Sequence, residues 1–391
     1  MDVIKDKEKA LERVRVFSFD LEYASEELKR DKEVVLAAVS RVGIVLEYAS
    51  EELRGDKEVV LAAVRNHGNA LEYASEELRG DKEVVLEAVK KYGLALSYAS
   101  EELRRDKEVV LAAVRGKDDN GLWHLKKGHV LKYTSEELRA DREVVLEAVK
   151  YSLFALQYAS EELRGDKEVV LEAVKSCGLA LHYASEELRA DREVVLVAVR
   201  QDGFALEYAS EELRGDKEVV LEAIRNNGRS FVNASEELRG DKEVLLEAIR
   251  QEPDMLIYAR GNFRDDNEFM VEAVRINPFA LQYASRNLRA DREVVLAAVR
   301  KKGYALLYAC EDLKSDPELL KYPGALEALE LDRKRKELIG FERQRKHKPQ
   351  EIGEGVETTE SAINNIQTEM IGEQTKRTGK QTEEQGDEEQ E

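Results

Sequence analysis

The residue types that carry chemistry in enzymes are few and scattered in this sequence. The five histidines are His67, His124, His129, His182 and His347. They have neither the spacing of zinc ligands nor a nearby pair of cysteines. The sequence also has no glycine-rich phosphate-binding loop and no Gly-x-Ser-x-Gly motif. We therefore expect no catalytic residue, no metal site and no cofactor, and we expect that the protein is not an enzyme.

One acidic run is superficially similar to part of a calcium-binding loop. It reads Asp118-Asp119-Asn120-Gly121. A calcium loop needs alternating acidic positions and a distal glutamate, and this run has neither. We interpret it as a plain turn.

A column of aspartates recurs with a period of 25 residues, apart from one step of 35 residues between Asp106 and Asp141. Its members are Asp6, Asp31, Asp56, Asp81, Asp106, Asp141, Asp166, Asp191, Asp216, Asp241, Asp266, Asp291 and Asp316. An array of reactive carboxylates is one interpretation. We favour helix capping, because each aspartate precedes an apolar segment with helical spacing, where its carboxylate can accept a hydrogen bond from a free backbone N–H group.

Each unit has the pattern of two short helices, as the unit that starts at Asp81 illustrates. The apolar stripe of the first helix is Val84, Val85, Ala88 and Val89. We expect Gly93 to adopt the left-handed conformation after this helix. The apolar face of the second helix is Ala95, Leu96, Ala99 and Leu103. Two alternatives stay open for Ser100: it lies within that helix, or it caps a separate short turn from Glu101 to Arg104.

A pair of helices this short cannot bury its own apolar face, so such units are stable only when they stack. The sequence thus predicts an all-α fold, an α-solenoid of about twelve 25-residue two-helix repeats. This solenoid covers residues 1–325, with a ten-residue insertion near 117–127. We expect a basic capping helix over 326–348 and a disordered acidic tail over 349–391, because the tail lacks the apolar residues needed to fold.

The recurring motif YASEELRxDKEVVLxAV, followed by xxGxAL, resembles the tandem repeats of domain-of-unknown-function family 4116. The resemblance covers roughly residues 6–320 and is specific because the motif recurs in phase. It implies an all-helical repeat module of the kind found in many copies per chain in microbes and protists. The family has no catalytic motif, so the resemblance transfers no functional residue. This sequence departs from the pattern at the insertion near Trp123 and in the units around Asn233 and Arg260.

Comparison of the repeats with one another also identifies columns that vary. They are the residue before each tyrosine of the motif and the two residues after the cation that ends the first helix, for example Lys301 and Lys302. A binding surface on a solenoid would use such columns. The alternative is neutral drift on a solvated turn.

The ten-residue insertion holds the only tryptophan and is locally basic on an acidic protein. Insertions in repeat proteins map to one face, often the binding face, and tryptophan beside cations is typical of interface anchors. The candidate partner-binding residues here are Trp123, His124, Lys126, Lys127 and His129. The alternative is a tolerated surface loop.

A second irregular stretch runs from Asn226 to Phe279, where Asn233 replaces tyrosine and Arg260 replaces serine. Pro253 and Pro278 replace the glycine after the first helix, and we expect the units to stack nonetheless. The further candidate partner-binding residues are Phe231, Asn233, Arg260 and Phe263. Relaxed selection explains the same changes.

The net charge of −20 is unevenly distributed. Residues 331–348 contain eight basic and three acidic residues, and residues 349–391 contain three basic and twelve acidic ones, which leaves −16 on the part through Glu330. That charge favours a protein partner with a basic or extended segment and disfavours nucleic acid for the solenoid, because phosphates would be repelled. No apolar run is long enough for a transmembrane segment.

The two cysteines, Cys177 and Cys310, form no disulfide framework, which favours an intracellular protein. We expect a cytoplasmic location, or a nuclear one through the basic clusters of 333–348. The predicted function is that of a non-enzymatic repeat protein that binds or scaffolds another protein through the solenoid surface. Two alternatives stay open: attachment to nucleic acid or a membrane surface through 331–348, and a microbial effector-type regulatory protein.

Overall fold

The computed structural model describes residues 3–116, 127–152 and 154–347. The chain divides into two compact units, Met1–Arg239 and Gly240–Glu391. Both are built from stacked helical repeats, and the described residues contain no β-strand, apart from an isolated bridge between Ile4 and Ala24. The predicted all-α solenoid is confirmed.

Each repeat contains one long helix of eight to ten residues that begins after an aspartate of the 25-residue column. In the first unit these helices are α1 (Lys7–Val16), α3 (Lys32–Val39), α5 (Lys57–Asn66), α7 (Lys82–Lys91), α8 (Lys107–Arg115), α11 (Arg142–Val149), α14 (Lys167–Ser176), α16 (Arg192–Gln201) and α18 (Lys217–Asn226). In the second unit they are α19 (Lys242–Gln251), α20 (Asn267–Ile276) and α21 (Arg292–Lys301). Their valine and alanine stripes are fully buried, as at Val84, Val85, Ala88 and Val89 in α7.

The long helix is followed by a short 3₁₀ helix. In the first unit these are η1 (Ser18–Tyr23), η2 (Gly43–Tyr48), η3 (Gly68–Tyr73), η4 (Gly93–Tyr98), η6 (Lys127–Tyr133), η7 (Gly178–Tyr183), η8 (Gly203–Tyr208) and η9 (Gly228–Asn233). In the second unit they are η11 (Pro253–Ile257), η13 (Pro278–Tyr283) and η14 (Gly303–Tyr308). One repeat has a short α-helix instead, α12 (Ala155–Tyr158).

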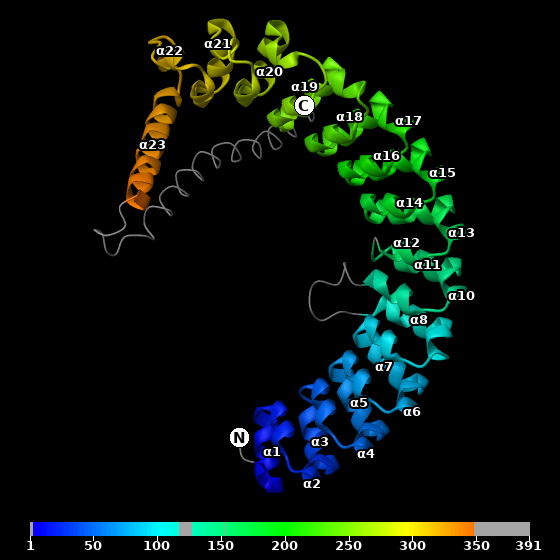
Figure 1. The fold of residues 1–391 in the computed structure, drawn as a ribbon. Helices are drawn as coiled ribbons and strands as arrows, with labels where there is room; N and C mark the ends of the chain where they lie inside the picture. The colour runs from blue at the N-terminus through cyan, green and yellow to red at the C-terminus, as the bar shows by residue number, and fades with distance from the viewer. Residues whose placement is uncertain (1–2, 117–126, 153, 348–391) are drawn as a thin grey trace, which may run out of the picture. The chain divides into compact units, whose positions relative to one another are not determined.

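A third piece, one turn long, completes the repeat. It is a four-residue α-helix at α2 (Glu26–Lys29), α4 (Glu51–Arg54), α6 (Glu76–Arg79), α10 (Glu136–Arg139), α13 (Glu161–Arg164), α15 (Glu186–Arg189), α17 (Glu211–Arg214) and α22 (Glu311–Lys314). It is a 3₁₀ turn at η5 (Leu103–Arg105), η10 (Leu238–Gly240) and η12 (Phe263–Asp265). After Asp316, the last aspartate of the column, the chain forms the 3₁₀ turn η15 (Leu319–Lys321) in place of a long helix. Within the first unit, the long helices lie side by side in chain order and the four-residue helices form a second row (Figure 1).

The expected second helix is therefore broken into two pieces. In the repeat of Asp81, Ala99 is extended, with φ −68° and ψ 157°, and separates η4 from the following turn. Ser100 Oγ accepts a hydrogen bond from Leu103 N at 3.4 Å, so the serine caps a separate turn and the alternative of a serine within a helix is wrong. The break places the Ser100 N–H group 2.9 Å from the carbonyl oxygen of Arg79 in the preceding repeat.

The expected left-handed glycine after the long helix is also wrong. Among the glycines of the described residues, only Gly261 and Gly324 have a positive φ. Gly93 is needed for a different reason, since a Cβ atom there would lie 2.4 Å from the carbonyl oxygen of Ala113 in the next repeat. Consecutive repeats thus approach closely at this point, and a side chain would hold them apart.

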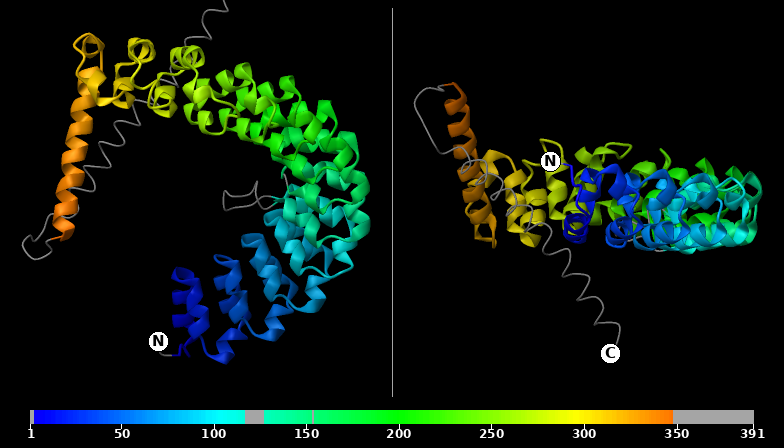
Figure 2. Two further views of the ribbon diagram at one scale, coloured as in Figure 1. Left: turned by 45° about the horizontal axis from the view of Figure 1, so that its top comes forward. Right: turned by 90° about the horizontal axis from the view of Figure 1, so that it is seen from below.

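The second unit ends its described part with α23 (Ala325–His347), which packs against η14 at its start. The rest of α23 extends away from the repeats of that unit (Figure 2). It covers the segment for which a basic capping helix was predicted, 326–348, up to His347. The predicted disordered tail, 349–391, lies outside the described residues.

Candidate functional site

The aspartate column is occupied by structural interactions. Asp81 Oδ1 accepts hydrogen bonds from Glu83 N at 3.0 Å and Val84 N at 3.1 Å, which is the predicted N-cap. Lys57 Nζ, one repeat earlier, lies 2.7 Å from Asp81 Oδ2 and 2.9 Å from Glu83 Oε2. The same pairing joins most neighbouring repeats, so these carboxylates bind cations of the chain itself rather than a substrate.

One of the variable columns is also partly structural. The residue directly after the cationic column donates a hydrogen bond to a carbonyl oxygen at the end of the preceding long helix. Asn66 Nδ2 binds Ser40 O at 2.9 Å, Ser176 Oγ binds Lys150 O at 3.0 Å, and Asn226 Nδ2 binds Arg200 O at 2.9 Å. Residues that differ in type therefore share one task, which is to satisfy carbonyl groups that the helix itself leaves unpaired.

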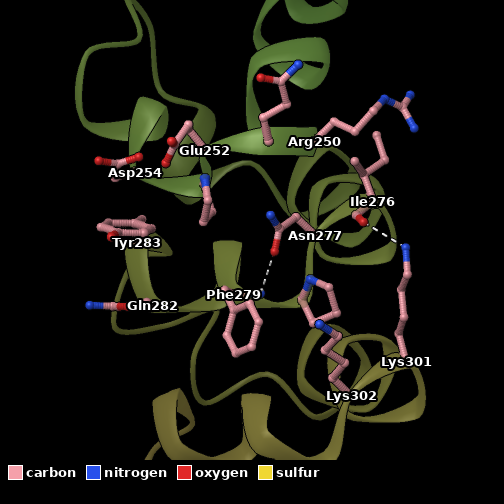
Figure 3. Close-up of a pocket in the computed structure, with 13 residues that line it drawn as sticks. Arg250, Glu252, Asp254, Ile276, Asn277, Phe279, Gln282, Tyr283, Lys301 and Lys302 are labelled. Carbon is pink, nitrogen blue, oxygen red and sulfur yellow. Dashed lines mark hydrogen bonds between the residues drawn. The ribbon is translucent and has the colours of Figure 1, made fainter. Parts of the chain in front are cut away.

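The variable columns line a cavity of about 420 Å³ in the second unit (Figure 3). It lies where the ends of α19, α20 and α21 meet η11 and η13. Its lining residues are Arg250, Gln251, Glu252, Pro253, Asp254, Ile276, Asn277, Pro278, Phe279, Gln282, Tyr283, Lys301 and Lys302. Pro253 and Pro278 begin η11 and η13, and the long helices before them end at Gln251 and Ile276.

The basic side of this cavity is fixed by interactions within the repeats. Lys301 Nζ donates to the carbonyl oxygens of Arg275 and Ile276, both at 2.7 Å. Burial lowers the pKa of Lys301, and the nearby charge of Arg250 lowers it further. Lys302 Nζ lies 5.3 Å from the centroid of the Phe279 ring. Lys301 binds the carbonyl end of α20, where the helix dipole is negative. Lys302 forms a cation–π contact with Phe279.

Asn277 stabilises the turn between α20 and η13. Its Nδ2 donates to Ile249 O at 3.0 Å, and its Oδ1 accepts from Phe279 N at 3.2 Å. The asparagine thus ties α19 to the start of η13. The ring of Phe279 is held in turn against Tyr308, with the two centroids 6.3 Å apart.

The acidic side of the cavity contains a hydrogen-bond acceptor that has no donor among the described residues. Asp254 Oδ1 is buried, and no donor of the described residues forms a hydrogen bond with it. Burial raises the pKa of the neighbouring Tyr283, and the charges of Asp254 and Glu252 raise it further. Figure 3 shows Asp254 and Glu252 on the same side as Tyr283, opposite Lys301 and Lys302. An aromatic ring beside an unsatisfied carboxylate is a suitable place for a cationic side chain.

The sequence did not single out Asp254, although a signal for it exists. The residue lies two positions after the cap of the 3₁₀ helix, in a column that is more often apolar than polar. Phe154, Leu179, Phe204 and Phe279 stand at equivalent positions, as do the polar Asn69, His129 and Arg229. An aspartate in such a column replaces packing with charge.

The candidate residues of the second irregular stretch do not form one site. Phe231 is fully buried, so its assignment as a partner-contact residue is wrong: it occupies the leucine column of the core, with Leu206 as its neighbour. Asn233 is half-buried at the end of η9 in the first unit. In the second unit, Arg260 is exposed, and Phe263 is half-buried with its ring centroid 4.7 Å from that of Phe269.

The insertion contributes one described side chain. Trp123, His124 and Lys126 lie outside the described residues, and Lys127 is the first residue of η6. His129 is half-buried, and its ring centroid lies 5.1 Å from that of Phe154 and 5.7 Å from that of Tyr158. His129 Nδ1 is buried and has no hydrogen-bond partner among the described residues.

Within residues 3–116, 127–152 and 154–347, no three His, Cys, Asp or Glu side chains are grouped so that they could hold a metal ion. None of the helices in this part of the chain has the length and apolar character needed to span a membrane.

Comparison with known proteins identifies the repeats. A family model described as "Domain of unknown function (DUF4116)" matches the chain in tandem, at residues 6–54, 31–79, 81–127, 124–164, 166–214, 216–264 and 266–314. No curated protein matches the chain.

Proposed function

The chain belongs to the DUF4116 family, and we propose, from the cavity of the second unit, that it is a non-enzymatic repeat protein that binds a basic segment of a partner protein. The cavity of the second unit is the proposed contact point for one arginine or lysine side chain. A guanidinium or ammonium group in the cavity would pair with the half-buried carboxylate of Asp254, whose Oδ1 has no donor among the described residues, and the ring of Tyr283 would lie beside it.

The observation that carries this proposal is the buried, unsatisfied oxygen of Asp254. A buried acceptor without a donor costs about 1–3 kcal/mol. Most carboxylates of the aspartate column are matched by cations of the chain, as Asp81 is by Lys57. The contrast supports a donor that arrives from outside the chain.

Attachment through the basic segment 331–348 is less well supported. On α23, Lys336 Nζ lies 2.6 Å from Asp332 Oδ2, and Arg333 Nε lies 3.7 Å from Glu337 Oε1. Two of its cations are therefore partly neutralised within the helix. An intracellular location is also part of the proposal, and the two free cysteines, Cys177 and Cys310, support it.

Selection of a random peptide library on the full chain tests the proposed function. We expect enrichment of peptides that contain arginine or lysine, and we expect D254N to weaken their binding about tenfold, because a charge-assisted hydrogen bond is lost. D265N is the matched control, since Asp265 is an exposed aspartate of the same unit. Absence of any enriched peptide family, or equal binding to wild type and D254N, would overturn the proposal.

A further inference from the structure

Tyrosines and glutamates lie in a row at the C-terminal ends of the 3₁₀ helices in the first four repeats. Each of η1, η2 and η3 ends with Glu-Tyr, η4 ends with Ser-Tyr, and each helix packs against the next. The tyrosines are half-buried and the glutamates are exposed. We call this surface the tyrosine–glutamate stripe; it consists of Glu22, Tyr23, Glu47, Tyr48, Glu72, Tyr73 and Tyr98.

Tyr48, Tyr73 and Tyr98 each lie close to a glutamate of the preceding repeat. Burial raises the pKa of Tyr48, and the charges of Glu22 and Glu47 raise it further. Burial raises the pKa of Tyr98 to about 12, together with a hydrogen bond to Glu72. The step between one tyrosine and the next is therefore a region of negative potential.

The carboxylates of the stripe differ from those that join the repeats. Asp56 and Glu58 are neutralised by Lys32, at 2.8 Å and 2.7 Å. No cation among the described residues forms an ion pair with Glu22 or Glu47. Glu22 and Glu47 thus carry charge that no ion pair of the described residues neutralises.

Tyr133, the next tyrosine of this column after Tyr98, indicates what such a tyrosine can bind. In the following repeat, the residue before the tyrosine is Lys132, and its Nζ lies 5.6 Å from the centroid of the Tyr133 ring. No cation of the described residues is placed in this way over Tyr48 or Tyr73. A cation over an aromatic ring, with a carboxylate near by, is a favourable arrangement at a surface.

The period of the stripe selects the conformation of a ligand. Stacked helices lie about 8–10 Å apart. Three residues of a polyproline II helix span about 9.3 Å, and every third side chain then points in the same direction. A β-strand of three residues covers a similar length, but its side chains alternate between two faces. The polyproline II conformation is therefore the one that presents equivalent side chains to successive repeats.

We infer that the tyrosine–glutamate stripe binds an extended segment of a partner protein with arginine or lysine at every third residue. The inference rests on the proposed protein-binding function and concerns a second surface, separate in sequence from the cavity at Asp254. One cation lies at each step of the stripe, over a tyrosine ring and between the glutamates of two repeats. Nucleic acid does not fit this surface, because its phosphates would face carboxylates.

Synthetic peptides of one composition test the spacing. Three isomers carry the same arginines at every second, every third or every fourth residue, with proline and alanine between them, and fluorescence anisotropy measures their binding to the full chain. We expect the isomer with arginine at every third residue to bind about tenfold more tightly than the other two. Equal binding of all three isomers, or no binding of any, would overturn the inference.

Charge-matched variants test the location. We expect the triple variant E22Q/E47Q/E72Q to weaken binding of the best isomer about tenfold. The control is E27Q/E52Q/E77Q, which removes the same charge from exposed positions of α2, α4 and α6. An equal loss in both triple variants would show attraction by net charge alone and would contradict the inference. Loss of binding of this isomer in E22Q/E47Q/E72Q but not in D254N would place it at the stripe, and the reverse pattern would place it at the cavity and contradict the inference, so failure at the stripe and failure at the cavity are distinguishable.

Discussion

Lys32 Nζ lies 2.8 Å from Asp56 Oδ2, while Oδ1 of the same carboxylate accepts hydrogen bonds from Glu58 N at 3.0 Å and Val59 N at 3.1 Å. One oxygen caps the long helix of its own repeat, and the other binds the cation of the preceding repeat. The aspartate therefore couples the start of each helix to the contact between repeats. Its two tasks can be separated by substitution and by pH.

Acid should unfold the repeat stack. The hydrogen bond from Lys32 is the largest cause that holds the pKa of Asp56 below its ordinary value, and the pKa of Asp31 is lowered in the same way by Lys7. A depressed pKa in the folded state contributes stability above the unfolded value of about 3.9, and this stability is lost as the pH falls through the folded value. Circular dichroism at 222 nm should show cooperative unfolding below about pH 4. An unchanged helical signal and melting temperature at pH 2 would contradict this.

Substitution of Asp191 should separate the two tasks of the carboxylate. Asp191 Oδ1 caps α16 through Glu193 N and Val194 N, and its Oδ2 lies 2.8 Å from Lys167 Nζ. D191A should lower the free energy of unfolding by about 0.5–2 kcal/mol through loss of the cap. D191N keeps a capping oxygen and should cost less than about 1 kcal/mol, the range for an exposed ion pair. Urea denaturation measures both, and a larger cost for D191N than for D191A would refute the division of roles.

The two glycines on either side of α14, Gly165 and Gly178, should respond in opposite ways to alanine. A Cβ atom at Gly178 would lie 2.3 Å from the carbonyl oxygen of Ala198, so G178A should destabilise the stack by about 1–3 kcal/mol or more. At Gly165 the nearest atom is 3.4 Å away and φ is −98°, so G165A should be neutral or slightly stabilising. Thermal melting of the two variants compares them directly. Equal melting temperatures would show that the close approach of neighbouring repeats does not restrict this position to glycine.

Ser230 is a buried serine in a column that is otherwise mainly apolar. Its hydroxyl group has no hydrogen-bond partner among the described residues, and the residue is fully buried. S230A should raise the free energy of unfolding by about 1 kcal/mol, because an unsatisfied polar group leaves the core. The control is S176A, which removes the bond from Ser176 Oγ to Lys150 O and should lower stability by about 0.5–1.5 kcal/mol. A loss of stability in S230A as large as in S176A would mean that the hydroxyl of Ser230 is satisfied.

The period of the sequence was sufficient to predict the stacked helical repeats and the caps, because both depend on residues that recur in every unit. The close contact at Gly93 was not predictable in the same way, since a glycine that ends a helix has the same sequence pattern whether it turns left-handed or touches a neighbour. The ion pair between Lys57 and Asp81 was also missed, although both residues recur at the fixed period. The aspartate was assigned only to the cap of its own helix, because its contacts with the adjacent repeat were not considered.

The candidate site was predicted only in part. Lys301 and Lys302 belong to columns that the sequence marked as variable, and they line the cavity. Phe231 was misplaced because a change of residue type was taken as a sign of exposure, whereas phenylalanine fills a leucine position of the core. Asp254 was missed because its column had not been recognised as mainly apolar. Burial is a property of a column, so comparison down each column is more informative than the rarity of one residue.

The ion pairs between repeats continue across the insertion. Lys82 Nζ lies 2.7 Å from Asp106 Oδ2, and Lys107 Nζ lies 2.8 Å from Asp141 Oδ2, although ten more residues separate the second pair. Most repeats offer a lysine or arginine at the same position to the unit that follows and an aspartate at the same position to the unit that precedes. Unequal recombination between gene copies of the repeat would therefore generate longer or shorter descendants whose new junctions are already complementary. Natural variation in copy number needs no compensating mutation, and selection can act on the length of the binding surface independently of the stability of the fold.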